Sequence, residues 1–77
     1  MKPATFKTLD VRPLLARGEE PFAIIRAEVN ALTAGRGLTV VAPFMPAPLI
    51  ELLKGEGFQC TAEHRADGGW SVNFWRD

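Results

Sequence analysis

The sequence predicts an α/β (α+β) fold in which two helices pack on one face of a four-stranded sheet, in the order β-α-β-α-β-β. Four segments, residues 5–11, 38–42, 58–65 and 70–76, alternate in polarity or are rich in β-branched and aromatic residues, as strands are. Two segments between them repeat apolar residues at helical spacing. Each helix has a single apolar stripe, which suits a two-layer sandwich and leaves one sheet face open.

The first half of the chain predicts a strand, a connection and a helix. The alternating strand Thr5–Val11 ends at the Arg12-Pro13 pair, and residues 14–18 connect it to the next element. Pro21 suits the first helical turn, where its missing N–H costs nothing. The apolar stripe, spaced by 3, 4 and 3 residues as far as a helix end near Thr33, comprises Phe22, Ile25, Val29 and Leu32.

The second half predicts a buried strand, a helix and a hairpin. The strand Leu38–Ala42 is short and apolar, and the three prolines that follow it place a loop before a helix that starts at Pro46 or Pro48. The predicted buried stripe of that helix comprises Leu49, Leu52 and Leu53. Two alternating strands then flank Asp67-Gly68-Gly69, whose residues favour a tight turn.

The length, charge and cysteine content of the chain exclude several classes of function. Seventy-seven residues predict one domain, residues 1–77, and a net charge of zero argues against a general binder of nucleic acid or anionic membranes. No apolar stretch is long enough to span a bilayer, and the N-terminal residues lack a signal-peptide core. With a single cysteine nothing requires an oxidising compartment, so the expected location is the cytoplasm.

Alternation along the strands predicts which side chains the open sheet face exposes. If Leu38, Val40 and Phe74 point toward the helices, then Phe6, Val41 and Trp75 point outward. Aromatic side chains among Thr, Ser and Asn are typical of protein contacts. A second apolar patch is expected at Phe44 and Met45 in the proline-rich loop, so the candidate interface comprises Phe6, Val41, Phe44, Met45 and Trp75.

Several short motifs resemble a known family. They are L-D-V-R-P-L at residues 9–14, the E-P pair at 20–21, A-G-x-x-L-x-V-V from Ala34, and P-x-P-L-x-x-L-L-x-x-x-G-F from Pro46. Together they resemble the sulfur-carrier superfamily TusA/SirA and, more closely, its uncharacterised relatives, the domain of unknown function 2249 family. The resemblance implies a two-layer sandwich like the C-terminal domain of translation initiation factor three, with strand order 1-2-4-3 and strand four antiparallel.

The resemblance also implies where chemistry would lie and shows that this chain departs from it. The carriers hold a persulfide on the cysteine of a C-P-x-P motif at the start of the first helix, and Gly18 stands at the matching position, with Glu20 at the variable one. Many uncharacterised relatives carry a D-H-D-P-like motif after strand two, where this chain has residues 43–46, P-F-M-P. A metal or haem role is therefore not expected.

The remaining candidates favour structural roles. Cys60 shares the core face of its strand, and His64 has no second ligand at metal-binding spacing. Glu19 and Glu20 are placed to stabilise a helix N-terminus. Asp10 and Arg12 are expected to pair with each other or to tie down the connecting loop. The candidate ligand cleft comprises Asp10, Arg12, Gly18, Glu20 and Pro46.

These observations predict a non-enzymatic cytoplasmic protein, without cofactor or metal, that associates with a protein partner or with itself as a homodimer. One alternative is a sulfur-transfer or redox accessory protein with Cys60 as its thiol. Another is a binder of a small ligand or metal cofactor in the candidate cleft.

Overall fold

Seven elements follow one another along residues 2–76, the part of the chain that the computed structural model describes. They are β1 (Thr5–Asp10), α1 (Arg12–Ala16), α2 (Phe22–Asn30), β2 (Arg36–Ala42), α3 (Ala47–Gly55), β3 (Gln59–His64) and β4 (Trp70–Trp75). The four strands and two longer helices occur in the predicted order.

The four strands form one open mixed sheet with the order β1-β2-β4-β3. β1 and β2 are parallel, whereas β4 runs antiparallel to both of its neighbours, β2 and β3. This is the strand order that the family resemblance implies. In the central pair of strands, β2 and β4, Leu38 lies opposite Phe74 and Val40 lies opposite Val72. These four side chains are fully buried, and the most buried strands are therefore the two at the middle of the sheet.

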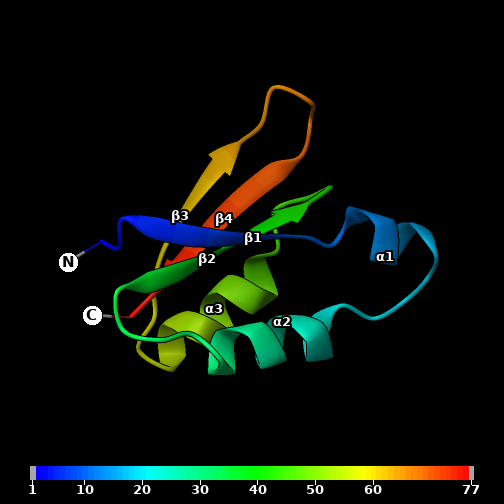
Figure 1. Ribbon diagram of the computed structural model, residues 1–77. Coiled ribbons are helices and arrows are strands. Elements are labelled where there is room, and N and C mark those ends of the chain that lie inside the picture. Colours follow the sequence, from blue (N-terminus) through cyan, green and yellow to red (C-terminus); the bar gives the residue numbers. More distant parts are fainter. Residues whose placement is uncertain (1, 77) are drawn as a thin grey trace.

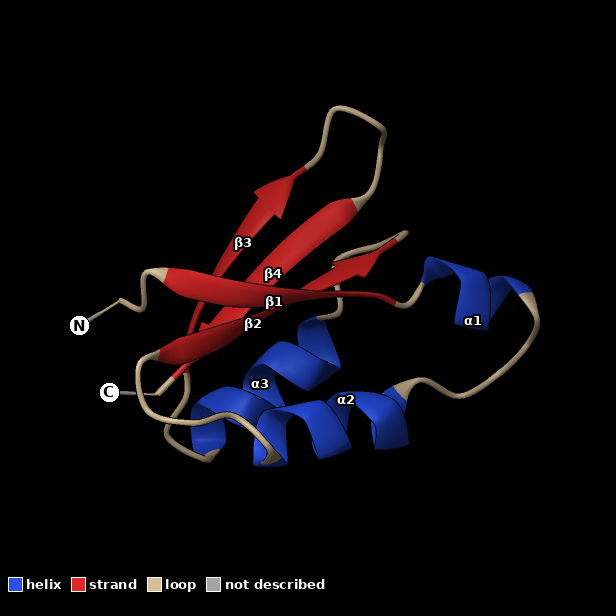
Figure 2. Ribbon diagram, viewed as in Figure 1, coloured by secondary structure: helices blue, strands red, loops and turns tan. Residues whose placement is uncertain are grey.

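The molecule has two layers, with α2 and α3 side by side on one face of the sheet (Figure 1). Figure 2 shows the opposite face of the sheet without a helix over it and α1 beyond the end of β1. Helix α1 lies where the sequence predicted a simple connection. Pro13 stands in its first turn, and the Leu15 N–H donates to the Val11 carbonyl at 3.0 Å, so five residues suffice for a short helix.

The core lies between the sheet and the two long helices. Its largest fully buried side chains are Phe74, Leu38, Leu53, Val11, Val40 and Val72. Helix α2 contributes Ile25 and Val29, and α3 contributes Ile50 and Leu53. Leu9 and Cys60 are half-buried against this cluster, on the face that alternation assigned to the core.

The β3–β4 hairpin closes through a glycine-rich turn. Gly68 has a φ of 90°, which favours glycine, and the Arg65 N–H donates to the Gly69 carbonyl at 2.8 Å. The Asp67 side chain accepts the Gly69 N–H at 2.9 Å. The turn predicted at residues 67–69 therefore forms, and it brings Asp67 to the end of the sheet where β1 finishes.

Candidate functional site

An arginine network of Asp10, Arg12, Arg65 and Asp67 joins the end of β1 to the hairpin turn. Arg12 donates from Nη2 and Nε to the Asp10 carboxylate, at 2.8 and 3.0 Å, and from Nη1 to Asp67 Oδ2 at 2.9 Å. Arg65 donates to the same Asp67 oxygen at 3.2 Å. The expected Asp10–Arg12 pair is present, and Asp67 is a partner that sequence reasoning missed.

The hydrogen bonds in this network lower the pKa of both carboxyl groups. The Gly69 N–H, followed by the guanidinium groups of Arg12 and Arg65, holds the pKa of Asp67 far below its ordinary value. Arg12 is the main reason that the pKa of Asp10 is lowered, and the two carboxylates raise the pKa of Arg12 in return. The charges satisfy one another, which supports a structural role for the network.

Replacing Arg12 with alanine is expected to remove part of the dependence of stability on acid. Because the folded pKa of Asp67 lies below its ordinary value of 3.8, its contribution to stability is present above that pH and is lost as the pH falls below it. The stability gap between wild type and Arg12→Ala should be widest at neutral pH and close as the solution is acidified below about pH 4. Urea unfolding followed by tryptophan fluorescence measures it. In an Asp67→Asn background the gap should be smaller, because only the Asp10 pair remains, and a gap that does not change with pH would contradict this role.

The residues of the candidate ligand cleft lie in two separate places in the structure. Asp10 and Arg12 belong to the arginine network, and Gly18 lies in the turn after α1 with a φ of 76°. Glu20 and Pro46 instead line a groove in the helix layer. A cysteine at position 18 would adopt a backbone conformation that L-residues avoid, so this turn does not reproduce a carrier-like site.

Glu19 and Glu20 have different partners. Arg17 donates from Nε to Glu19 Oε2 at 2.5 Å, whereas Glu20 Oε1 accepts the backbone N–H of Phe22 at 2.8 Å. The second contact satisfies a free backbone donor at the start of α2, which is the role predicted for Glu20. The same prediction is wrong for Glu19, because this residue pairs with Arg17 and α2 begins only at Phe22.

The helix-layer groove lies between the N-terminal parts of α2 and α3 and has a volume of about 340 Å³. The residues that line it are Glu20, Pro21, Phe22, Ile25, Phe44, Pro46, Pro48, Leu49 and Leu52. Glu20 is the charged member of this set. The Arg26–Glu56 ion pair, with a distance of 2.6 Å from Nη1 to Oε1, bridges the two helices farther along α2. The ion pair therefore connects α2 to the end of α3, whereas the groove separates the N-terminal parts of the two helices.

Two residues that helical spacing predicted to be buried are exposed in this groove. Phe22 keeps 42% of its surface in solvent and Leu52 keeps 39%. Ile25 and Leu53 of the same predicted stripes are buried, and Ile50, which was not predicted, joins them in the core. Phe22 is the first residue of α2, and Leu52 lies on the flank of the buried stripe of α3, so neither side chain is covered by the sheet. Both line the same groove. Phe44 adds a third side chain from the proline-rich loop, 55% exposed.

The predicted exposure of three apolar side chains on the open sheet face is wrong for two of them. Val41 and Trp75 are buried, and Phe6 is half-buried. Phe6 packs its ring edge-on to Trp75, with ring centroids 6.1 Å apart and planes at 88°. This contact crosses Gly37, where a Cβ would stand 2.3 Å from the Phe6 ring. The absence of a side chain on Gly37 lets Phe6 reach Trp75.

Val41 is shielded by polar neighbours at the other end of the same face. In the register it lies between Asp10 and Ser71, which hold the guanidinium groups of Arg12 and Arg65. Between the two shielded ends runs a row of hydrogen bonds, in which Thr39 Oγ1 donates to Asn73 Oδ1 at 2.6 Å and Asn73 Nδ2 donates to Thr61 Oγ1 at 3.1 Å. The middle of the open face is therefore polar, with the Phe6–Trp75 pair at one end of it.

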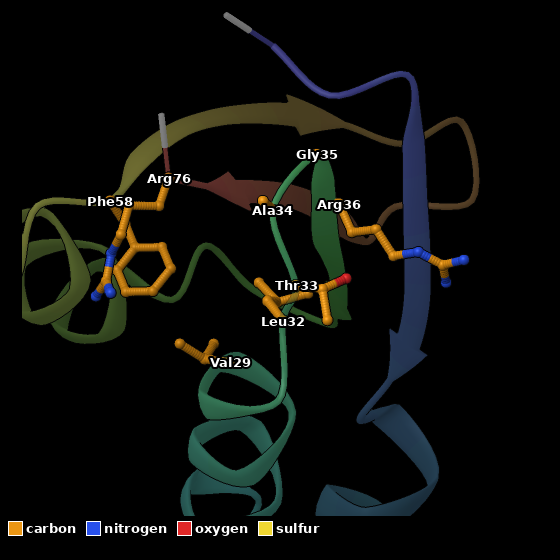
Figure 3. A pocket seen from close by; sticks show the side chains of 8 residues that line it. All are labelled: Val29, Leu32, Thr33, Ala34, Gly35, Arg36, Phe58 and Arg76. Carbon is orange, nitrogen blue, oxygen red and sulfur yellow. The ribbon is translucent and has the colours of Figure 1, made fainter.

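Figure 3 shows a second hollow, between the end of α2 and the end of the sheet. It carries two arginines, but Arg36 extends away from Arg76 in this view. The Arg76 guanidinium instead lies 4.1 Å from the centroid of the Phe58 ring and donates to the Glu56 carbonyl at 3.4 Å. The two cations do not converge on a shared anion position.

The other candidates for chemistry lie apart from one another. His64 is exposed at the end of β3, with its ring centroid 5.0 Å from that of Trp70. Cys60 is half-buried on the face of β3 that packs toward the core. Within residues 2–76, no three His, Cys, Asp or Glu side chains gather as a metal site would require.

In the same part of the chain, no helix combines the length and the apolar character that crossing a membrane demands.

No curated protein and no solved structure shows a significant match to the chain. A family model described as an uncharacterized conserved protein, DUF2249, matches residues 8–76. This match includes every helix, all of β2 to β4 and the end of β1, and so the chain belongs to the DUF2249 family.

Proposed function

We propose that this chain is a non-catalytic cytoplasmic module of TusA/SirA-like fold that binds a protein partner through the helix-layer groove. The β1-β2-β4-β3 strand order, which the resemblance to the sulfur carriers implies, supports the fold assignment. A glycine with positive φ, Gly18, at the position of the carrier cysteine supports a role in recognition rather than in sulfur transfer.

The exposure of Phe22, Phe44 and Leu52 around one groove is the observation that carries the proposal. Leaving apolar surface in water costs about 25 cal/mol per Å², so a small domain gains by keeping such side chains buried. Contiguous exposed apolar patches mark contact sites more often than single exposed residues do. Phenylalanine and methionine are also enriched at protein interfaces, and Met45, 47% exposed, stands beside Phe44.

Site-specific photo-crosslinking tests the groove as the docking surface. A benzophenone side chain at Phe44 should give a discrete adduct with a partner in cells of the source organism, because that position lies at the groove. The same group at Thr61, on the polar sheet face, is the matched control and should give none. Leu52→Ser should remove the Phe44 adduct while changing the free energy of unfolding by less than about 1 kcal/mol, since Leu52 is partly exposed.

The adduct pattern decides the result. Equal crosslinking from positions 44 and 61, or an adduct from position 44 that survives Leu52→Ser, would contradict docking at the groove. If Leu52→Ser removes the adduct by unfolding the chain, the cooperative urea transition is lost as well. Leu52→Met keeps the apolar surface and should then restore the adduct and the cooperative transition.

A further inference from the structure

We infer that the occupant of the helix-layer groove is an amphipathic helix of a partner protein that places a lysine or arginine against Glu20. This inference rests on the proposed function and adds the chemistry of the partner. It follows from the shape of the groove, the surface around it and the charge at its rim.

The shape favours a helix. The groove is a trough between two helices, and side-chain ridges of a third helix pack into such troughs at interaxial distances of about 8–10 Å. Phe22, Phe44 and Leu52 line it from α2, the loop and α3, so an apolar stripe laid along the trough contacts all three. Each keeps more than a third of its surface in solvent, so the hollow is open along its length rather than enclosed.

The surface beside the groove favours a macromolecule over a small ligand. Met45 lies outside the lining but next to Phe44, and it is 47% exposed. A small molecule seated in the groove would leave Met45 in water, whereas a helix that extends past the loop would cover it.

The charge at the rim favours a basic partner. Glu20 uses Oε1 to accept the Phe22 N–H, and among residues 2–76 no hydrogen bond reaches Oε2. The adjacent Glu19 is paired with Arg17. Glu20 is therefore the charge that a partner meets as it enters the apolar groove, and an ammonium or guanidinium group complements it.

The same charge disfavours a second copy of this chain. In a symmetric dimer built on the groove, the same surface of both copies meets, so two Glu20 side chains would enter one apolar interface. The lining offers no basic residue to pair with either of them.

Two fluorescent peptides distinguish the charge from the groove. Both are about 16 residues long and carry leucines at positions i, i+3, i+4 and i+7, and they differ only in lysine or glutamate at the flanking sites. Fluorescence anisotropy with the full chain at low salt should show roughly threefold to fivefold tighter binding of the lysine peptide. Glu20→Lys should reverse this preference, and Glu20→Gln should abolish it. Glu51→Gln, which removes the same charge from α3 outside the groove lining, is the matched control and should leave the preference unchanged.

The outcomes separate the two proposals. If both peptides bind equally and Phe22→Ser weakens both, the groove docks apolar helices but the assignment of a basic partner is wrong. If neither peptide binds while position 44 still crosslinks a partner in cells, the groove binds something other than a helix. Binding of a small aromatic amine without either peptide, or a groove-dependent dimer in sedimentation at the concentration used, would also overturn the inference. A lysine preference that persists in Glu20→Lys would assign the charge to another residue.

Discussion

Phe74→Ala is expected to lower the free energy of unfolding by about 3–5 kcal/mol, the usual cost of truncating a buried aromatic side chain to alanine. Phe74 is fully buried in the central strand β4, between Leu38 of β2 and Cys60 of β3. A domain of this size has about 4–12 kcal/mol of stability in total. The loss is therefore a large fraction of the total, and the midpoint of urea unfolding, followed by circular dichroism, should fall well below that of the wild type.

Phe44→Ala is the matched control for that variant, because it makes the same chemical change at a side chain that is 55% exposed. It should change the free energy of unfolding by no more than about 0.5 kcal/mol. A large loss at Phe44 would mean that the loop supports the fold rather than a partner, and a small loss at Phe74 would contradict the assignment of the core.

Gly37→Val is expected to uncover Trp75 and to cost about 1–3 kcal/mol, because a branched side chain must displace the Phe6 ring that lies over this glycine. Phe6 would then lose its contact with Trp75. In a Trp70→Phe background, emission from Trp75 should shift to longer wavelength and become more accessible to acrylamide. Urea unfolding gives the accompanying loss of stability.

A double-mutant cycle checks the cause of this loss. If Gly37→Val acts by displacing Phe6, adding Phe6→Ala should cost much less than it does in the wild type. Gly55→Ala is a control for glycine replacement in general, because its Cβ would meet nothing within 4 Å and it should be neutral or slightly stabilising. Independent effects of Gly37→Val and Phe6→Ala would contradict the close approach.

The order of strands and long helices could be predicted because each has a periodic pattern that depends on neighbouring residues alone. Helix α1 could not, because five residues around Pro13 are too short to show a period. The approach of Phe6 to Trp75 was missed for a different reason. Alternation assigns both to one face, but it takes the register to show that the glycine in β2 lies between them.

The helix-layer groove was only partly predictable. Phe44 and Met45 were identified because prolines on either side exclude a regular element around them. Phe22 and Leu52 were assigned to the core because helical spacing gives the direction of a side chain about its axis. It does not give how far the sheet extends along and across each helix to cover that side chain. The pairing of Arg12 with Asp67 joins residues 55 positions apart, and no local pattern predicts such a contact.

The row of hydrogen bonds from Thr39 through Asn73 to Thr61 affects more than its own strands. Its side chains already use one another as partners, so an approaching polypeptide gains little by replacing those bonds. Of the two broad sides of the molecule, the helix side carries the exposed apolar groove, and the sheet side carries polar side chains that already bond one another. With the partner proposed for the groove, these two surfaces would give the protein a valence of one: it would cap or occupy a site on a larger assembly without linking two neighbours into a growing chain.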